Sequence, residues 1–294
     1  MIVVTTPTGT LGSQVLAALL TADEPVRVIV RDPSRLPAPV RARVEVVAGS
    51  HGDPSAVDRA FTGADTVFWV VPPAPGAVSL DAAFVDFTRP ACDALVRHGV
   101  RRVVGVSALG RGFVGEAGLA TASLAMDDLI AATGIAYRAL AMPAFMENLL
   151  AFVPVIRSQG MFFSLVDGDR RLPTVASRDI AAVAARFLLD RSWTGQDSVP
   201  VPGPQDLSFD EIARIVSDVL GRPVRYRRLP PDEFRAAMSA AGMSDAMVQG
   251  MVDMLLAKNR GLDTVGPRTA RSATPTDFRS WCEEVLAPAV SAAA

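Results

Sequence analysis

The sequence predicts an α/β protein in which a doubly wound parallel sheet is followed by a smaller, mostly helical C-terminal region. Through about residue 142, short valine-rich segments alternate with amphipathic segments of helical periodicity, which is the pattern of βαβ units. A glycine-containing turn lies between the first of these strands and the first helix. After Pro143 the alternation ends and helical periodicity dominates. Together these observations favour a Rossmann-like first half.

Six strands are expected in the first half, and each is apolar on both faces, as in strands that helices cover on both sides. They span residues 2–5, 26–30, 44–47, 66–71, 102–107 and 136–141. The periodicity between them predicts helices over residues 11–20, 55–61, 80–98 and 123–132.

The second half is expected to consist mainly of helices, the first over residues 178–189. Ser208 and Glu211 have the spacing of a capping box, and Gly221 is a stop signal, so a helix is expected between Ser208 and Gly221. Two amphipathic helices follow, over residues 232–241 and 244–256. No obvious linker appears, so we expect a first domain of residues 1–150 and a substrate and lid region of residues 151–294 packed on it.

The last two helices are rich in methionine, and two interpretations of this remain open. The residues are Met238, Met243, Met247, Met251 and Met254. Methionine fills irregular gaps in cores, and it also lines surfaces that adapt to a ligand. The helices are therefore either ordinary core elements or a mobile lid over an apolar ligand.

Composition excludes several classes of function. Half of the 294 residues are hydrophobic and a fifth are charged, which is typical of globular proteins, and the net charge of −2 offers no field for nucleic acid or an anionic membrane. No uncharged apolar stretch approaches the ~18 residues of a membrane span, and residues 1–5 already form a strand, so we expect neither membrane insertion nor a signal peptide, and a cytoplasmic location. The cysteines (Cys92 and Cys282) and histidines (His51 and His98) show no metal-ligand pattern, so we expect buried free thiols and no metal.

The turn after the first strand is suited to bind a pyrophosphate. Residues 4–12 read VTTPTGTLG, and such a turn directs backbone N–H groups and a helix N-terminus at an anion. Gly9 allows the phosphates to approach and Gly12 allows the helix to pack closely on the strand, whereas Thr6 replaces the usual first glycine. The predicted contacts are Thr6, Thr8, Gly9, Thr10, Leu11 and Gly12.

The end of the second strand indicates which dinucleotide binds. An acidic side chain there would hold the ribose hydroxyls of NAD, whereas arginine accommodates the additional phosphate of NADP. The chain offers Arg31 and Arg35, whose guanidinium groups suit a phosphate monoester. Asp32 lies one step beyond the strand and should point elsewhere. Ser50 and His51 follow the third strand and are expected to flank the adenine, so the predicted cofactor is NADPH or NADP+.

These segments resemble the NmrA-like branch of the atypical short-chain dehydrogenases/reductases. The matching residues are 8–12, 28–33, 63–67, 133–137, 143–150 and 175–181. The resemblance implies that the loop after the fourth strand (Val70, Val71, Pro72) and the loop that begins at Ser107 line the nicotinamide pocket, and that Pro143 and Phe145 contact the cofactor. Expected substrate contacts are Phe113, Met126, Met146, Asn148, Met247 and Met251.

Short-chain dehydrogenases/reductases ordinarily protonate the product with a Tyr-x-x-x-Lys pair, and this chain has none. Ala141 follows Tyr137 at that spacing, Pro230 follows Tyr226, and Lys258 is the one lysine. Ser107 remains a candidate catalytic residue, because it holds a position like that of the serine of the family's triad.

Two functions are compatible with this pattern. The first is an NADPH-dependent ketoreductase whose substrate supplies the proton from a phenol beside the ketone, as a polycyclic aromatic polyketide or a quinone of specialised metabolism could. The second is a non-enzymatic NADP(H)-sensing regulator, as some family members are. Turnover of NADPH with an aryl ketone or a quinone distinguishes them. The oligomeric state is left open.

Overall fold

The centre of the molecule is a seven-stranded parallel sheet, seen in a computed structural model that describes residues 1–264 and 273–292. The strand order is β10-β6-β5-β4-β1-β2-β3, and every neighbouring pair is parallel. The strands are β1 (Ile2–Val4), β2 (Val26–Val30), β3 (Glu45–Ala48), β4 (Thr66–Trp69), β5 (Arg102–Ala108), β6 (Ala136–Met142) and β10 (Gln196–Pro200). The Rossmann-like doubly wound sheet predicted from the sequence is confirmed, with all six expected strands.

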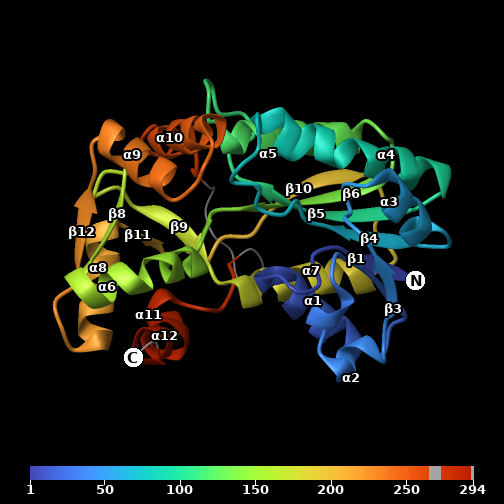
Figure 1. The fold of residues 1–294 in the computed structure, drawn as a ribbon, viewed down its shortest axis with the longest axis horizontal. Coiled ribbons are helices and arrows are strands. Elements are labelled where there is room, and N and C mark those ends of the chain that lie inside the picture. Colours follow the sequence, from blue (N-terminus) through green and yellow to red (C-terminus); the bar gives the residue numbers. More distant parts are fainter. Residues whose placement is uncertain (265–272, 293–294) are drawn as a thin grey trace.

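Helices cover both faces of this sheet, as Figure 1 shows. Helices α1 (Thr10–Thr21) and α7 (Ser177–Leu189) lie on one face, and α3 (Pro54–Phe61), α4 (Phe87–Arg97) and α5 (Leu119–Ala131) lie on the other. In β1, Ile2 and Val4 pack toward α1, whereas Val3 packs toward α3 and α4. Burial on both faces explains why these strands read as continuous apolar runs.

In the first half of the chain, two helices differ most from their predicted limits. The helix expected over residues 80–98 consists of a π-helical turn, η2 (Ala82–Asp86), followed by α4. Pro90 lies inside α4 and has no N–H for the carbonyl of Asp86, so regular α-helical bonding is interrupted there. Helix α5 begins at Leu119, four residues before the predicted start, because Gly118 turns the chain with a φ of 49°.

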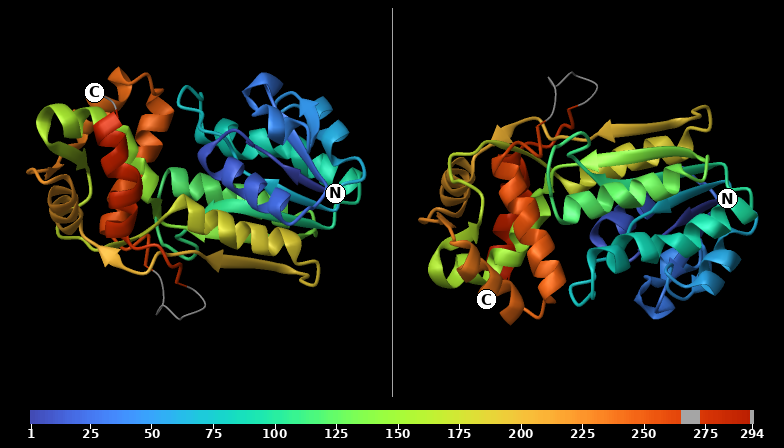
Figure 2. Two further views of the ribbon diagram at one scale, coloured as in Figure 1. Left: turned by 90° about the horizontal axis from the view of Figure 1, so that it is seen from below. Right: turned by 90° about the horizontal axis from the view of Figure 1, so that it is seen from above.

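The second half forms a smaller body beside one end of the sheet (Figure 2). Its elements are β7 (Ala144–Phe145), η3 (Met146–Phe152), α6 (Val153–Gln159), β8 (Met161–Ser164), β9 (Leu172–Val175), β11 (Asp206–Leu207), α8 (Phe209–Leu220), β12 (Arg225–Arg228), α9 (Pro231–Ala240), α10 (Asp245–Asn259), α11 (Phe278–Trp281), η4 (Cys282–Leu286) and α12 (Ala287–Ala292). The capping box of α8 is present with both of its bonds, and Gly221 ends that helix in the left-handed conformation. In the first half, the short elements η1 (Pro33–Arg35) and α2 (Ala38–Arg41) lie between β2 and β3.

The chain returns from the smaller body to the large sheet. Helix α7 packs on α1, where Gln14 donates to the hydroxyl of Ser177 at 2.8 Å, and β10 pairs with β6 along its whole length. Two elements that follow residue 150, α7 and β10, therefore belong to the large sheet and its covering helices, and not to the smaller body. The predicted second region also includes residues 265–272 and 293–294, which lie outside the described residues.

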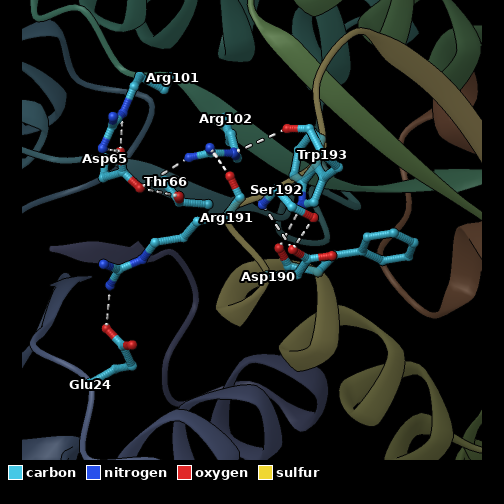
Figure 3. A network of polar contacts seen from close by, with 10 residues as sticks. Glu24, Asp65, Thr66, Arg101, Arg102, Asp190, Arg191, Ser192 and Trp193 are labelled. Atoms are coloured by element: carbon cyan, nitrogen blue, oxygen red, sulfur yellow. Dashed lines mark hydrogen bonds and ion pairs between the residues drawn. The ribbon is translucent and has the colours of Figure 1, made fainter.

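A polar network fastens the returning segment to the sheet at the edge opposite the ends where β1, β4 and β5 finish (Figure 3). Arg102, at the start of β5, bonds Asp65 at 3.3 Å and donates to the carbonyls of Arg191 and Trp193. Arg191 in turn pairs with Glu24 at 2.8 Å. The network lies at the amino ends of β4 and β5, away from the carboxyl ends of the strands. Within the described residues, no helix is long and apolar enough to cross a membrane.

Candidate active site

The carboxyl ends of the strands bring most of the predicted cofactor residues to one edge of the sheet. Arg31 follows β2, Thr6 follows β1, Val70 follows β4, Ser107 lies near the end of β5, and Pro143 follows β6. These strands stand side by side in that order. The order reverses between β1 and β4, and ligands of open α/β sheets bind at such a switch point.

The turn after β1 is held in a strained and compact form. Thr6 has a φ of 50°, a left-handed conformation that a β-branched residue rarely adopts. Glycine, which is usual at this position of such turns, adopts this conformation without strain. The buried Thr5 hydroxyl joins the ends of the two switch-point strands, since it donates to the carbonyl of Phe68 at 2.9 Å and accepts from the N–H of Val70 at 3.0 Å.

Glycine at position 12 is required by the close approach of α1 to this turn. A Cβ there would lie 2.2 Å from the carbonyl oxygen of Thr6, so any other residue would push the helix away. Gly9 precedes α1 and caps it without a side-chain bond, and the first turn of the helix carries no acidic residue.

The start of α1 leaves backbone donors available. The N–H groups of Thr10, Leu11 and Gly12 have no acceptor among the described residues, whereas the next one, that of Ser13, bonds the carbonyl of Gly9. Unpaired donors at a helix N-terminus form an anion site, which the helix dipole strengthens. The side chain of Leu11 is buried in the core beneath, so only the backbone of that predicted contact faces the site.

The two arginines after β2 are exposed, and neither forms an ion pair within the described part of the chain. Asp32 is turned away, because its carboxylate caps η1 by accepting from the N–H and hydroxyl of Ser34 at 2.9 and 2.6 Å. These bonds hold the pKa of Asp32 below its usual value. Arg31 and Arg35 are therefore the charged groups that this strand end offers to a ligand.

His51 is buried beneath the candidate site and bonds the loop after β4. Its ring is 7% exposed and packs edge-on against Trp69 and Phe87. Burial lowers the pKa of His51 to about 4, so the ring is neutral at pH 7, and its Nε2–H donates to the carbonyl of Val70 at 2.9 Å. The neighbouring Ser50 accepts from the N–H of Gly52 at 3.2 Å. His51 thus fixes the loop after β4, and whether it or Ser50 meets an adenine stays a prediction.

The loops expected to line the nicotinamide lie together across β4, β5 and β6. Val70, Val71 and Pro72 are partly exposed, whereas Ser107 is buried and stands opposite Ala141 in the register of β5 and β6. Beyond β6, Pro143 is buried and Phe145 is partly buried in β7, where the chain enters the smaller body.

Ser107 belongs to a buried polar cluster that the sequence analysis missed. Its hydroxyl bonds one carboxyl oxygen of Asp127, and the hydroxyl of Tyr137 donates to the other at 2.6 Å. Tyr137 fits because β5 has glycine at position 105, where a Cβ would lie 2.3 Å from the phenol oxygen. A signal was present in the sequence, since Asp127 falls on the same helix face as Ser123 and Ile130, which is otherwise directed at the core.

The remaining tyrosine and the lysine lie elsewhere and are engaged. Tyr226 stacks on Phe209 at 4.7 Å and donates to the carbonyl of Val166 at 2.5 Å. Lys258, near the end of α10, forms a buried ion pair with Asp263. Neither is placed to act as the acid of a Tyr/Lys pair. Both cysteines are buried free thiols, as predicted.

Helix α10 bridges the loops at the nicotinamide end. Its capping residue Ser244 donates through its hydroxyl to the carbonyl of Ala77 at 2.6 Å, in the loop after β4. In its middle, the backbone of Gly250 passes so close to Gly118 that a Cβ on Gly118 would lie 1.9 Å from the carbonyl oxygen of Gly250. Beyond its end, Arg260 donates to the carbonyl of Glu116 at 3.1 Å and its guanidinium lies over the ring of Phe113.

Several predicted substrate contacts are core residues. Met126 is 1% exposed in the core between the sheet and α3 to α5, and Met146 is buried in the core of the smaller body, so we withdraw both as substrate contacts. Met251 packs with Leu165 and Phe234 in a small core, which favours the core interpretation of the methionines over the lid. Phe113 is partly buried, Asn148 is exposed, and Met247 is buried. Their contact with a substrate stays a prediction.

Comparisons with known proteins identify a family and a shared fold. A model of the NmrA-like family matches residues 1–282. The (4-alkanoyl-5-oxo-2,5-dihydrofuran-3-yl)methyl phosphate reductase of Streptomyces griseus is 34% identical over 290 residues, 97% of each chain, and the NAD(P)H azoreductase of Xenophilus azovorans is 30% identical over 254 residues, 86% of each chain. The NADPH-dependent quinone oxidoreductase of Escherichia coli, solved with NADPH, shares the fold with a TM-score of 0.79 at 23% identity, over 100% of this chain and 99% of that one.

Proposed function

The chain belongs to the NmrA-like family, and we propose that it is an NADPH-dependent oxidoreductase that reduces the carbonyl group of an aromatic ketone or quinone. The relatives that align with most of its length include an NAD(P)H azoreductase, a furanone phosphate reductase and an NADPH-dependent quinone oxidoreductase. They favour an enzyme over the sensor that the missing Tyr/Lys pair also allows.

One observation carries the proposal. Unpaired N–H groups at the start of α1 lie at the switch point of the sheet, between the exposed Arg31 and Arg35 on one side and Ser107 on the other. A dinucleotide with an additional ribose phosphate matches this order, because the arginines would hold that phosphate, the helix start the pyrophosphate, and the loops after β4 and β5 the nicotinamide. The donors and charges present therefore fit NADPH.

The residues of this chain mainly position the reactants and exclude water. When bound, NADPH supplies the hydride. Ser107 stands where a hydroxyl can donate to the carbonyl oxygen of the substrate, and α10 spans the loops around it, which limits access of water. No residue provides the usual phenol and ammonium pair, so a hydroxyl on the substrate beside the carbonyl supplies the hydrogen bond and the proton.

This requirement narrows the substrate class. A phenol beside a ketone or quinone carbonyl is common in polycyclic aromatic polyketides such as angucyclinones, which would place the enzyme in the biosynthesis of antibiotics or similar compounds. Phe113 and Met247 are the apolar residues that we expect nearest such a ring system. An intramolecular hydrogen bond of this kind strengthens as negative charge develops on oxygen, so it acts mainly in the transition state.

Two aromatic ketones that differ only by methylation of the adjacent hydroxyl test this mechanism. We expect the methyl ether to lower kcat more than it raises KM, because the lost interaction is nearly absent from the ground state. The Ser107→Ala variant, assayed with the free phenol, should lose less activity than methylation removes. Equal rates for the phenol and its ether would refute substrate assistance while leaving NADPH-dependent reduction intact.

A further inference from the structure

A buried carboxyl group lies directly behind the hydroxyl that we place at the reacting carbonyl. Asp127, on α5, is 2% exposed, and its two oxygens bond the hydroxyls of Ser107 and Tyr137. The aspartate is almost fully buried, and it reaches the residues at the carboxyl ends of the strands through its bond with Ser107.

The hydrogen-bond inventory of this cluster leaves two arrangements. A hydroxyl has a single proton to donate, and an ionised carboxylate can only accept. With Asp127 ionised, both Ser107 and Tyr137 use their protons on it, and Ser107 has nothing left to donate to a substrate. With Asp127 neutral, its own proton is donated to the oxygen of Ser107, and the serine proton is free to point at the active site.

We propose, on the premise of the reductase function above, that Asp127 is a positioning residue whose protonation turns the Ser107 hydroxyl toward the substrate carbonyl. No bond to carbon is made or broken in this step, since one proton on Asp127 only redirects a hydrogen bond. The neutral carboxyl group is the active form and the carboxylate is the inactive one. Tyr137 donates to the other oxygen of Asp127 in both forms and holds it in place.

Both protonation states of Asp127 are accessible near neutral pH because its surroundings both raise and lower its pKa. Burial raises the pKa of Asp127 to about 6, and the bonds from Ser107 and Tyr137 and the charge of Arg111 act in the opposite direction. Arg111, in the loop after β5, approaches the carboxylate at 3.8 Å, and Asp128 beside it on α5 raises the pKa slightly. From α4, Cys92 faces Tyr137 and is neutral, because burial raises its pKa to about 12.

The pH profile of turnover tests the proposal, with an aromatic ketone chosen so that its adjacent hydroxyl stays protonated over the pH range measured. The parent enzyme should be most active below the pKa of Asp127 and lose up to about tenfold in kcat per pH unit above it, until it reaches the rate of Ser107→Ala. Asp127→Asn should be independent of pH over this range and stay within a few-fold of the parent's low-pH rate, because the amide donates to Ser107 permanently. KM should change little, since the orientation matters for charge that develops in the transition state.

Two surface variants test the same idea if Asp127→Asn fails to fold. The side chains of Arg111 and Asp128 are 49% and 66% exposed, so their replacement spares the core. Arg111→Gln removes a positive charge and should move the midpoint of the profile to higher pH, whereas Asp128→Asn should move it to lower pH. Midpoints that do not move, or an Asp127→Asn profile that matches the parent, would overturn the proposal. A parent enzyme that consumes no NADPH at any pH would instead refute the reductase function itself.

Discussion

Arg31 is the residue on which we expect cofactor choice to depend most. It is exposed at the end of β2, near enough to His51 for its charge to lower the pKa of that buried ring, and no carboxylate of the described residues neutralises it. Asp32, which could have held a ribose hydroxyl, is committed to capping Ser34. The strand end therefore presents positive charge where we propose that the additional phosphate of NADPH binds.

From this arrangement we expect NADPH to bind at least about tenfold more tightly than NADH, which corresponds to about 1.4 kcal/mol. Arg31→Ala should remove most of that difference by weakening NADPH and leaving NADH unchanged. Titration calorimetry measures both constants, and Arg227→Ala, at an exposed arginine on β12 of the smaller body, is the control. Equal affinity of the unaltered protein for the two cofactors would refute the assignment.

At the scale of elements, α10 connects the smaller body to the loops after β4 and β5. It is fixed at its start by Ser244, in its middle by the approach of Gly250 to Gly118, and at its end by the ion pair of Lys258 with Asp263. That pair is almost fully buried, so neither charge can be left alone without a large cost of desolvation.

A double-mutant cycle on this pair tests that interpretation. Lys258→Met or Asp263→Leu alone should lower the free energy of unfolding by about 3–5 kcal/mol, and the two changes together should cost clearly less than the sum. The exposed pair of Arg227 with Glu233 is the matched control and should couple by less than about 1 kcal/mol. Additive effects at Lys258 and Asp263 in urea unfolding would show that the pair does not fix the end of α10.

Some elements of the fold could be predicted from the sequence and others could not. Buried strands such as β2 and β6 are recognisable because both faces are apolar, and the capping box of α8 is a local signal. Strand β10 was missed because it is an edge strand of sequence QDSVP with exposed side chains, whose place depends on pairing with β6. In the site, the phosphate-binding turn and the two arginines could be predicted because they directly follow recognisable strands. The contact of Asp127 with Ser107 could not, because it depends on how α5 packs on the sheet, and periodicity alone does not determine that packing.

At the scale of the whole molecule, the two bodies have separate tasks. The large sheet carries the donors and charges for a dinucleotide along one edge, and the network around Arg102 stabilises the opposite edge. The smaller body follows β6 directly through Pro143 and β7, and returns to the sheet through α7 and β10. A substrate bound between α10 and the loops after β4 and β5 would therefore lie against the nicotinamide end of the cofactor.

The most direct test of NADPH-dependent carbonyl reduction is a single-turnover measurement of NADPH oxidation. Enzyme in excess over NADPH is mixed with an aromatic ketone or a naphthoquinone that carries a hydroxyl beside the carbonyl. The loss of NADPH absorbance is then followed together with the formation of the reduced product. We expect one equivalent of product per NADPH, a slower reaction in Ser107→Ala, and no reaction without protein. NADPH that binds tightly but is not consumed with any of these carbonyl compounds would contradict the proposed function.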